Sequence, residues 1–218
     1  MPALLRFALL PVFACIASCT GTRVLADPTL VIRTQAGTEL GVSTAYGVLF
    51  LGRTAQSGRV EITAWFQDGP SIESAAVEPI GGGLYTAETE IQLPAVPLSF
   101  DEPKPGTELL LIGRNRRGTW ERTVKVRADP RVQGLLISVP SELENAPDQI
   151  GTGAYLVDPD DDHKRTFVGL VSGRIRLATA EGDREYLTVI GPRDTWRLVT
   201  HRRDLGRRKR WIYRDDIL

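Results

Sequence analysis

Side chains capable of chemistry are concentrated in one acidic stretch of this 218-residue chain, where Asp158, Asp160 and Asp162 precede His163. Clustered carboxylates supply the hard oxygen ligands that Ca²⁺ prefers, so the three aspartates are a candidate calcium site. The stretch lacks the twelve-residue spacing of an EF-hand loop, with its glycine and final glutamate. Because like charges so close together repel one another, the sequence favours a solvated turn over a metal site. No cofactor is expected.

A second concentration consists of four consecutive cations near the end of the chain: Arg207, Arg208, Lys209 and Arg210. A basic run beside an aromatic side chain, here Trp211, can bind anionic partners such as lipid phosphates, lipopolysaccharide or nucleic acid. The alternative is a surface segment in which Trp211, Ile212 and Tyr213 pack on the fold while the cations face water. We favour the surface segment.

The third candidate for chemistry is Cys19. The residues before it have the features of a signal peptide, with an early cation, Arg6, and an apolar run over 7–16 that is too short to span a bilayer permanently. The sequence Ile16-Ala17-Ser18-Cys19 ends this run and resembles a bacterial lipobox. That resemblance implies that residues 1–18 are removed and that Cys19 is lipidated.

The residue after Cys19 bears on localisation. It is Thr20 instead of aspartate, which by the same resemblance implies an outer-membrane lipoprotein of the cell envelope, facing the periplasm. An ordinary secretory signal cut near Ala26 is the alternative, and it would make the protein periplasmic or secreted. Either route removes the protein from nucleic acid. The expected partners are the membrane, through the lipid, and another envelope protein or peptide.

Composition adds little about partners, because 27 basic residues balance 27 acidic ones. The two cysteines are Cys15 and Cys19, so lipidation of Cys19 leaves a mature chain without a thiol or a disulfide. Such an exported protein must be held together by its core. Roughly 200 mature residues suffice for one large domain or two small ones.

The elements that must position any site are short β-prone runs separated by turn residues, which indicates an all-β sandwich or barrel. These runs are 29–32, 46–51, 59–66, 74–79, 84–93, 108–113, 120–126, 134–139, 154–157 and 167–175. Helical periodicity is found only near the end, where Pro192 follows Gly191 and opens a predicted short helix that offers Trp196, Leu198 and Val199 for packing.

Four motifs follow one another along these runs. Residues 62–66 read Ile-Thr-Ala-Trp-Phe, 105–113 read Pro-Gly-Thr-Glu-Leu-Leu-Leu-Ile-Gly, 151–157 read Gly-Thr-Gly-Ala-Tyr-Leu-Val, and 168–172 read Val-Gly-Leu-Val-Ser. In order and spacing, the chain from 37 to 203 resembles the trypsin-like serine proteases. The motifs match a Leu-Thr-Ala-x-His strand end, the first strand of the second barrel, the segment around the nucleophile and the strand that follows it. The resemblance implies an all-β, trypsin-like double six-stranded β-barrel with a short C-terminal helix.

The catalytic positions depart from that family. By the resemblance, Phe66 occupies the position of the base, Ala87 that of the acid and Thr152 that of the nucleophile. A protease triad needs an imidazole within hydrogen-bond reach of the hydroxyl and an acid that orients it. Phe66 cannot accept a proton, and the two histidines, His163 and His201, lie elsewhere in the sequence. No catalytic residue is therefore expected.

The predicted organisation is a signal peptide over 1–18, a tether and first strand over 19–35, a double-barrel domain over 36–203 and a basic tail over 204–218. The barrels are expected at about 36–100 and 104–190. The favoured function is a lipid-anchored, catalytically inactive binding or scaffolding module. Two alternatives remain: an active hydrolase with Thr152 or a nearby serine as a non-standard nucleophile, and an unrelated β-sandwich lipoprotein.

Overall fold

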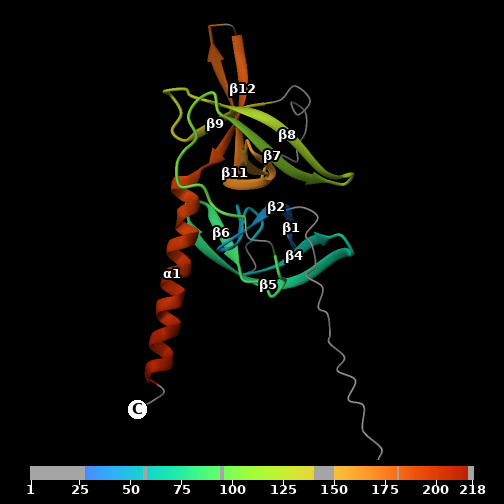
Figure 1. Cartoon of the computed structure of the whole chain (residues 1–218), viewed down its shortest axis with the longest axis vertical. Helices are drawn as coiled ribbons and strands as arrows, with labels where there is room; N and C mark the ends of the chain where they lie inside the picture. The colour runs from blue at the N-terminus through green and yellow to red at the C-terminus, as the bar shows by residue number, and fades with distance from the viewer. Residues whose placement is uncertain (1–27, 56–57, 94–95, 140–149, 181, 216–218) are drawn as a thin grey trace, which may run out of the picture.

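The structure is a computed structural model that describes residues 28–55, 58–93, 96–139, 150–180 and 182–215. Its strands form two closed antiparallel barrels, one above the other in Figure 1, with a single helix along one side. This arrangement confirms the predicted all-β double six-stranded barrel with a C-terminal helix. No helix among the described residues is long and apolar enough to cross a membrane.

The first barrel has the strand order β1-β2-β3-β6-β5-β4. Its strands are β1 (Thr29–Thr34), β2 (Gly37–Thr44), β3 (Gly47–Phe50), β4 (Arg59–Phe66), β5 (Gly69–Gly81) and β6 (Leu84–Ala87). Alternate residues of β4, among them Val60, Ile62 and Phe66, face a cluster that fills this barrel. That alternation is the period-2 pattern of a strand with one buried face.

The second barrel has the order β10-β11-β12-β9-β8-β7. Its strands are β7 (Glu108–Asn115), β8 (Gly118–Arg127), β9 (Leu135–Ser138), β10 (Gly153–Asp158), β11 (Asp161–Thr179) and β12 (Gly182–Ile190). Residues 176–179 of β11 and 182–185 of β12 pair only with each other in the described part of the chain, and they project beyond the barrel at the top of Figure 1. We call this projection the arm.

Each barrel is filled by its own hydrophobic cluster, and a third cluster joins the barrels. The first barrel contributes Val42, Leu49, Leu51 and Leu84, and the second contributes Ile112, Tyr155, Phe167 and Leu170. The linker between the barrels adds Leu98, which forms an isolated bridge with Phe167. Two hydrogen bonds fasten the linker to that residue, from Phe167 N to Pro97 O (2.8 Å) and from Ser99 N to Phe167 O (2.7 Å). The barrels are therefore packed against each other through side chains of both.

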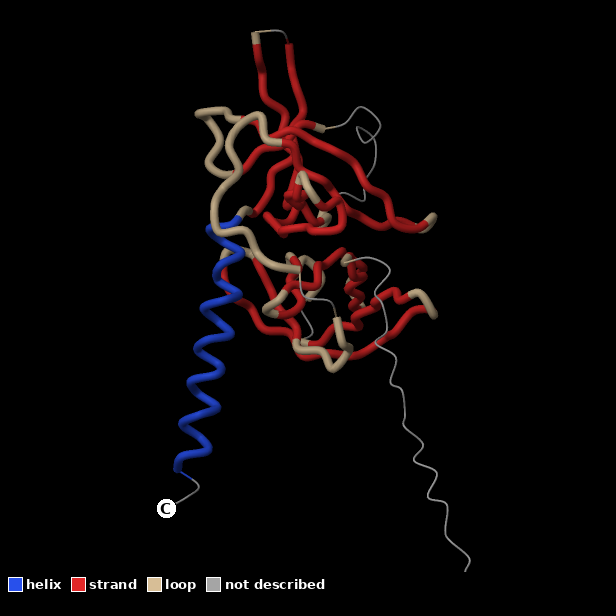
Figure 2. The backbone as a smooth tube through the Cα atoms, viewed as in Figure 1, coloured by secondary structure: helices blue, strands red, loops and turns tan. Residues whose placement is uncertain are grey.

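Helix α1 (Pro192–Asp215) completes this junction. Proline is tolerated at its first position because that residue's N–H has no partner within the helix, and Leu198 and Val199 are buried in the cluster between the barrels. The helix begins at the end of β12 and runs along the first barrel and past it (Figures 1 and 2). It spans 24 residues, longer than the short helix predicted, because the Arg- and Lys-rich residues after 203 favour helix.

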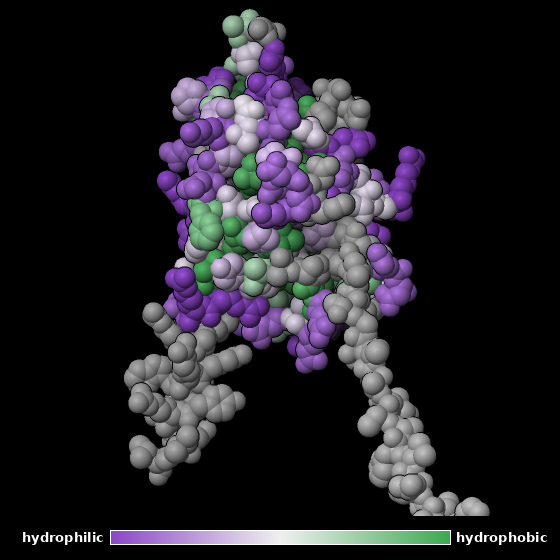
Figure 3. Space-filling view, in the orientation of Figure 1, coloured by the Kyte–Doolittle hydropathy of each residue, from purple (hydrophilic) through white to green (hydrophobic). Residues whose placement is uncertain are grey.

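Polar contacts also hold α1 to the first barrel. The Arg202 guanidinium donates to the Tyr46 carbonyl (2.7 Å) and pairs with Glu88 (2.9 Å), while His201 contacts Glu78 of β5. On the face in Figure 3, most of the surface is hydrophilic and apolar side chains reach it near the junction of the barrels. The exposed Phe100 ring lies 4.6 Å from the Trp196 ring of α1, centroid to centroid.

Candidate functional site

The candidate site is a pocket of about 700 Å³ lined by residues of both barrels, which we call the inter-barrel pocket. Its lining from the first barrel includes Arg33, Glu39, Leu40, Arg53, Thr54 and Trp65. The second barrel and the segment before β10 supply Arg114, Asn115, Arg116 and Ile150. A ligand in this pocket would contact both barrels.

Glu39 organises one wall of this pocket. Its nearly buried carboxylate accepts hydrogen bonds from the Thr54 backbone N–H (3.2 Å), the Thr54 hydroxyl (2.9 Å) and the Arg53 backbone N–H (3.3 Å). These bonds hold the segment after β3 against the start of β2. Burial of a carboxylate requires such donors, since an unpaired buried charge is costly. Glu39 therefore positions Arg53 and Thr54 at the pocket.

Trp65 and Arg114 form a contact across the junction. The Arg114 guanidinium carbon lies 3.7 Å from the centroid of the Trp65 ring, a cation–π geometry, and its Nη1 donates to the Thr119 hydroxyl (3.0 Å). Trp65 faces the pocket while its neighbour Phe66 faces the barrel interior, because successive residues of a strand point to opposite faces. This pocket was not predicted, since its arginines are scattered over β1, the segment after β3 and β7–β8 and form no sequence motif.

The predicted triad positions lie away from the lining of this pocket. Phe66 and Ala87 are buried together in the cluster that fills the first barrel. Thr152 is buried in the turn directly before β10. The structure thus brings Phe66 and Ala87 into one cluster that does not include Thr152. Their equivalence to a protease triad stays a prediction.

The turn that carries Thr152 is tightly packed. Thr152 is 0% exposed, and its Oγ1 has no hydrogen-bond partner among the described residues. Gly151, with φ of +85°, lies against β2 so closely that a Cβ on it would be 2.6 Å from the Leu40 carbonyl oxygen. Val171 holds the backbone of this turn, since the Gly151 N–H donates to the Val171 carbonyl (2.7 Å) and the Val171 N–H donates to the Thr152 carbonyl (2.9 Å). Among the described residues the hydroxyl has no base beside it, and it has no access to solvent.

Of the two histidines, only His201 has a described side chain, and it does not line the inter-barrel pocket. The His201 imidazole lies on α1 with Glu78, and the side chain of His163 lies outside the described residues. No imidazole therefore lines the inter-barrel pocket within the described part of the chain.

The acidic turn is a tight β10–β11 connection. Asp158 accepts a hydrogen bond from the Asp160 N–H (3.0 Å) and pairs with Lys164 (3.0 Å), and these two contacts lower the pKa of its carboxyl. The Asp162 side chain lies outside the described residues. Among the described residues, no group of three or more His, Cys, Asp or Glu side chains is placed to hold a metal ion.

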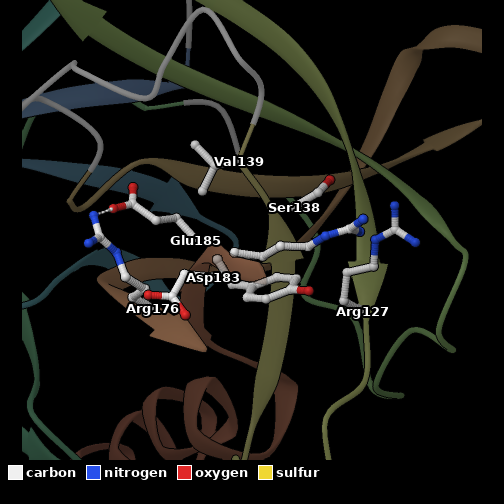
Figure 4. Close-up of a pocket in the computed structure, with 8 residues that line it drawn as sticks. Arg127, Ser138, Val139, Arg176, Asp183 and Glu185 are labelled. Atoms are coloured by element: carbon white, nitrogen blue, oxygen red, sulfur yellow. Dashed lines mark hydrogen bonds and ion pairs between the residues drawn. The ribbon is translucent and has the colours of Figure 1, made fainter. Parts of the chain in front are cut away.

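A second pocket, of about 710 Å³, lies beside the arm. In Figure 4, Arg127 stands on one side and the ion-paired Arg176 and Glu185 on the other. Glu185 also pairs with Arg174 (2.9 Å), and the hydrogen bond from Arg176 (2.7 Å) is the main reason that its pKa is lowered. Because these charges satisfy one another, this pocket is the weaker candidate for a ligand.

Two further predicted sites, the lipidation site and the basic cluster, have side chains outside the described residues. Cys19 lies outside the described residues, and so do the side chains of Arg207, Arg208, Lys209 and Arg210, although the backbone there is helical. Lipidation and the anionic-partner hypothesis for the basic cluster therefore stay predictions.

Solved structures share this architecture. The MamO protease domain from Magnetospirillum magneticum, in its apo form, aligns over 80% of this chain and 95% of its own, at 17% identity and a TM-score of 0.54. A human pathogenic astrovirus serine protease aligns over 79% and 96%, at 14% identity and 0.51. A mutant of the Tobacco Etch Virus protease aligns over 76% and 74%, at 11% identity and 0.50. No family model and no curated protein matches the sequence, so these likenesses concern the fold alone.

Proposed function

We propose that this chain, whose two barrels have the trypsin-like serine protease fold, is a catalytically inactive binding or scaffolding module anchored by lipid in the cell envelope. The observation that carries the proposal is the state of Thr152, whose hydroxyl is buried and has no hydrogen-bond partner among the described residues. A hydroxyl attacks a carbonyl at neutral pH only when a neighbouring base takes its proton.

The alternative of an active hydrolase has one observation in its favour, the hydrogen bond from the Thr54 hydroxyl to Glu39 at the inter-barrel pocket. That carboxylate also accepts the backbone N–H groups of Arg53 and Thr54, so its contacts are those of a side chain that holds the segment after β3 in place. Inactivity is therefore the better-supported function.

Inactivity is tested with a fluorophosphonate probe, which labels activated serine and threonine nucleophiles. The purified chain is expected to remain unlabelled and to leave unfolded casein intact, because the Thr152 hydroxyl is buried and no described residue is placed to take its proton. Labelling is read by gel fluorescence beside an active trypsin-like protease as positive control. Labelling that disappears in Thr152→Ala or in Thr54→Ala would establish a hydrolase instead.

The lipid anchor rests on the sequence before Cys19, and the same sequence supports an outer-membrane location facing the periplasm. Cys19→Ala is expected to release the protein from the membrane fraction and to abolish labelling by a palmitate analogue, because a lipid thioether requires that thiol. Cys15→Ala is the matched control and should stay in the membrane fraction. A wild-type chain without lipid would make the protein periplasmic or secreted.

A further inference from the structure

The inter-barrel pocket has an unbalanced charge. Four arginines line it, Arg33, Arg53, Arg114 and Arg116, against the single carboxylate of Glu39, a net of +3. The chain as a whole is neutral, with 27 basic and 27 acidic residues. The lining of this pocket is thus positive although the chain is neutral, and a pocket lined mainly by one sign of charge attracts ligands of the opposite sign.

Two of these arginines are available to a ligand. Arg33 pairs with Glu61 (3.3 Å), and Arg114 stacks on Trp65. The side chains of Arg53 and Arg116 are exposed and, within the described part of the chain, have no carboxylate partner. Glu39 does not supply one, since its two oxygens accept from the Arg53 and Thr54 backbone and from the Thr54 hydroxyl. Arginine is well suited to carboxylates, which it can bind through two parallel N–H···O bonds.

The pocket also has an apolar wall. Val31 and Leu40 of the first barrel and Ile150 before β10 line it together with the Trp65 ring. A bare phosphate would leave this wall unused, whereas a peptide can place an apolar side chain on it and carboxylates on the arginines. The mixture of cations and apolar side chains therefore favours a polypeptide ligand.

We propose that the inter-barrel pocket binds an acidic peptide segment, with carboxylates on Arg53 and Arg116 and an intervening apolar side chain against Leu40 and Ile150. This inference rests on the proposed function, because it assigns a ligand class to the binding module. It requires no chemistry at Thr152, so its failure is separable from a failure of the inactivity test.

The test measures fluorescence anisotropy of a peptide of alternating glutamate and valine, capped at both ends and carrying an uncharged dye, with the full chain in a non-ionic detergent. Arg53→Gln combined with Arg116→Gln is expected to weaken binding by about tenfold or more, because hydrogen bonds to charged groups are lost. Binding should also weaken as salt is raised. The matched control is Arg193→Gln combined with Arg203→Gln, which removes the same charge from exposed positions on α1 and should bind as the wild type does.

Competition then identifies the ligand class. A glutamine–valine peptide should not displace the probe, whereas the unlabelled acidic peptide should. Inorganic phosphate and phosphatidylglycerol, the latter as mixed micelles with the detergent, are tested as competitors in the same assay. The proposal is overturned if the two peptides bind equally, if both double variants weaken binding to the same extent, or if only the phosphatidylglycerol micelles or phosphate compete. Circular dichroism of each double variant confirms that the barrels remain folded.

Discussion

Truncation after Ile190 is expected to yield a protein that aggregates or unfolds well below the temperature of the full chain. The truncation removes Leu198 and Val199, which are 0% and 1% exposed in the cluster between the barrels. Burial of each such side chain contributes roughly 1.5–3 kcal/mol, against a total stability of about 5–15 kcal/mol. The loss also uncovers the barrel side chains beneath the helix. Soluble yield and thermal unfolding by circular dichroism measure the effect.

The matched control is truncation after Asp204, which keeps the buried turn of α1 and its contacts through His201 and Arg202. It should unfold at nearly the temperature of the full chain. If the protein truncated after Ile190 were as stable as the full chain, the helix would contribute nothing to the stability of the junction. If truncation after Asp204 were as damaging as truncation after Ile190, the distal half of α1 would be the part that stabilises the fold.

Gly169→Ala is expected to destabilise the second barrel strongly. A Cβ on Gly169 would lie 2.0 Å from the Ile190 carbonyl oxygen and 2.9 Å from a methyl group of Val189. The obstacle is the backbone of β12, so relief requires a strand to move, and not merely a side chain. Overpacking a core costs about 1–3 kcal/mol and more where the backbone resists, so we expect about 3 kcal/mol and a fall in Tm of roughly 6–12 °C.

Gly191→Ala provides the comparison, because a Cβ there would meet nothing closer than 3.7 Å, at Leu135. The residue precedes α1, where alanine is a poorer N-terminal cap than glycine, so a loss below about 1 kcal/mol is expected. Urea unfolding monitored by tryptophan fluorescence gives both free energies. Equal losses in the two variants would refute the close approach of β11 and β12 at Gly169.

Much of the fold could be predicted from the sequence, because most strands carry turn residues at their ends and a buried face. Strand β2 was not predicted, since its last six residues are all buried and its Gly, Ser and Thr residues show no apolar alternation. The predicted strand over 84–93 ends early, at Ala87. Its remainder is held instead by the Glu73 carboxylate, which accepts from the Thr89 hydroxyl and the Ile91 N–H. That contact joins residues far apart in sequence and has no local signature.

The candidate site was much harder to predict. Sequence motifs pointed to Phe66 and Thr152, whose surroundings depend on which face of a strand they occupy. A one-residue step along β4 separates the buried Phe66 from Trp65 on the pocket. The pocket arginines come from segments that are brought together only when the two barrels pack. Their shared function depends on that packing and so is not visible in composition or spacing.

Both strand edges of the arm are unpaired within the described part of the chain, and such edges can recruit other chains into a continuous sheet. Its side chains oppose that outcome. Arg174 and Arg176 both pair with Glu185 across the hairpin, and Asp183 and Arg184 lie exposed nearby. A strand that added to either edge would have to approach these charged side chains and desolvate them. The second barrel can therefore extend well beyond its closed wall without offering a template for fibril growth.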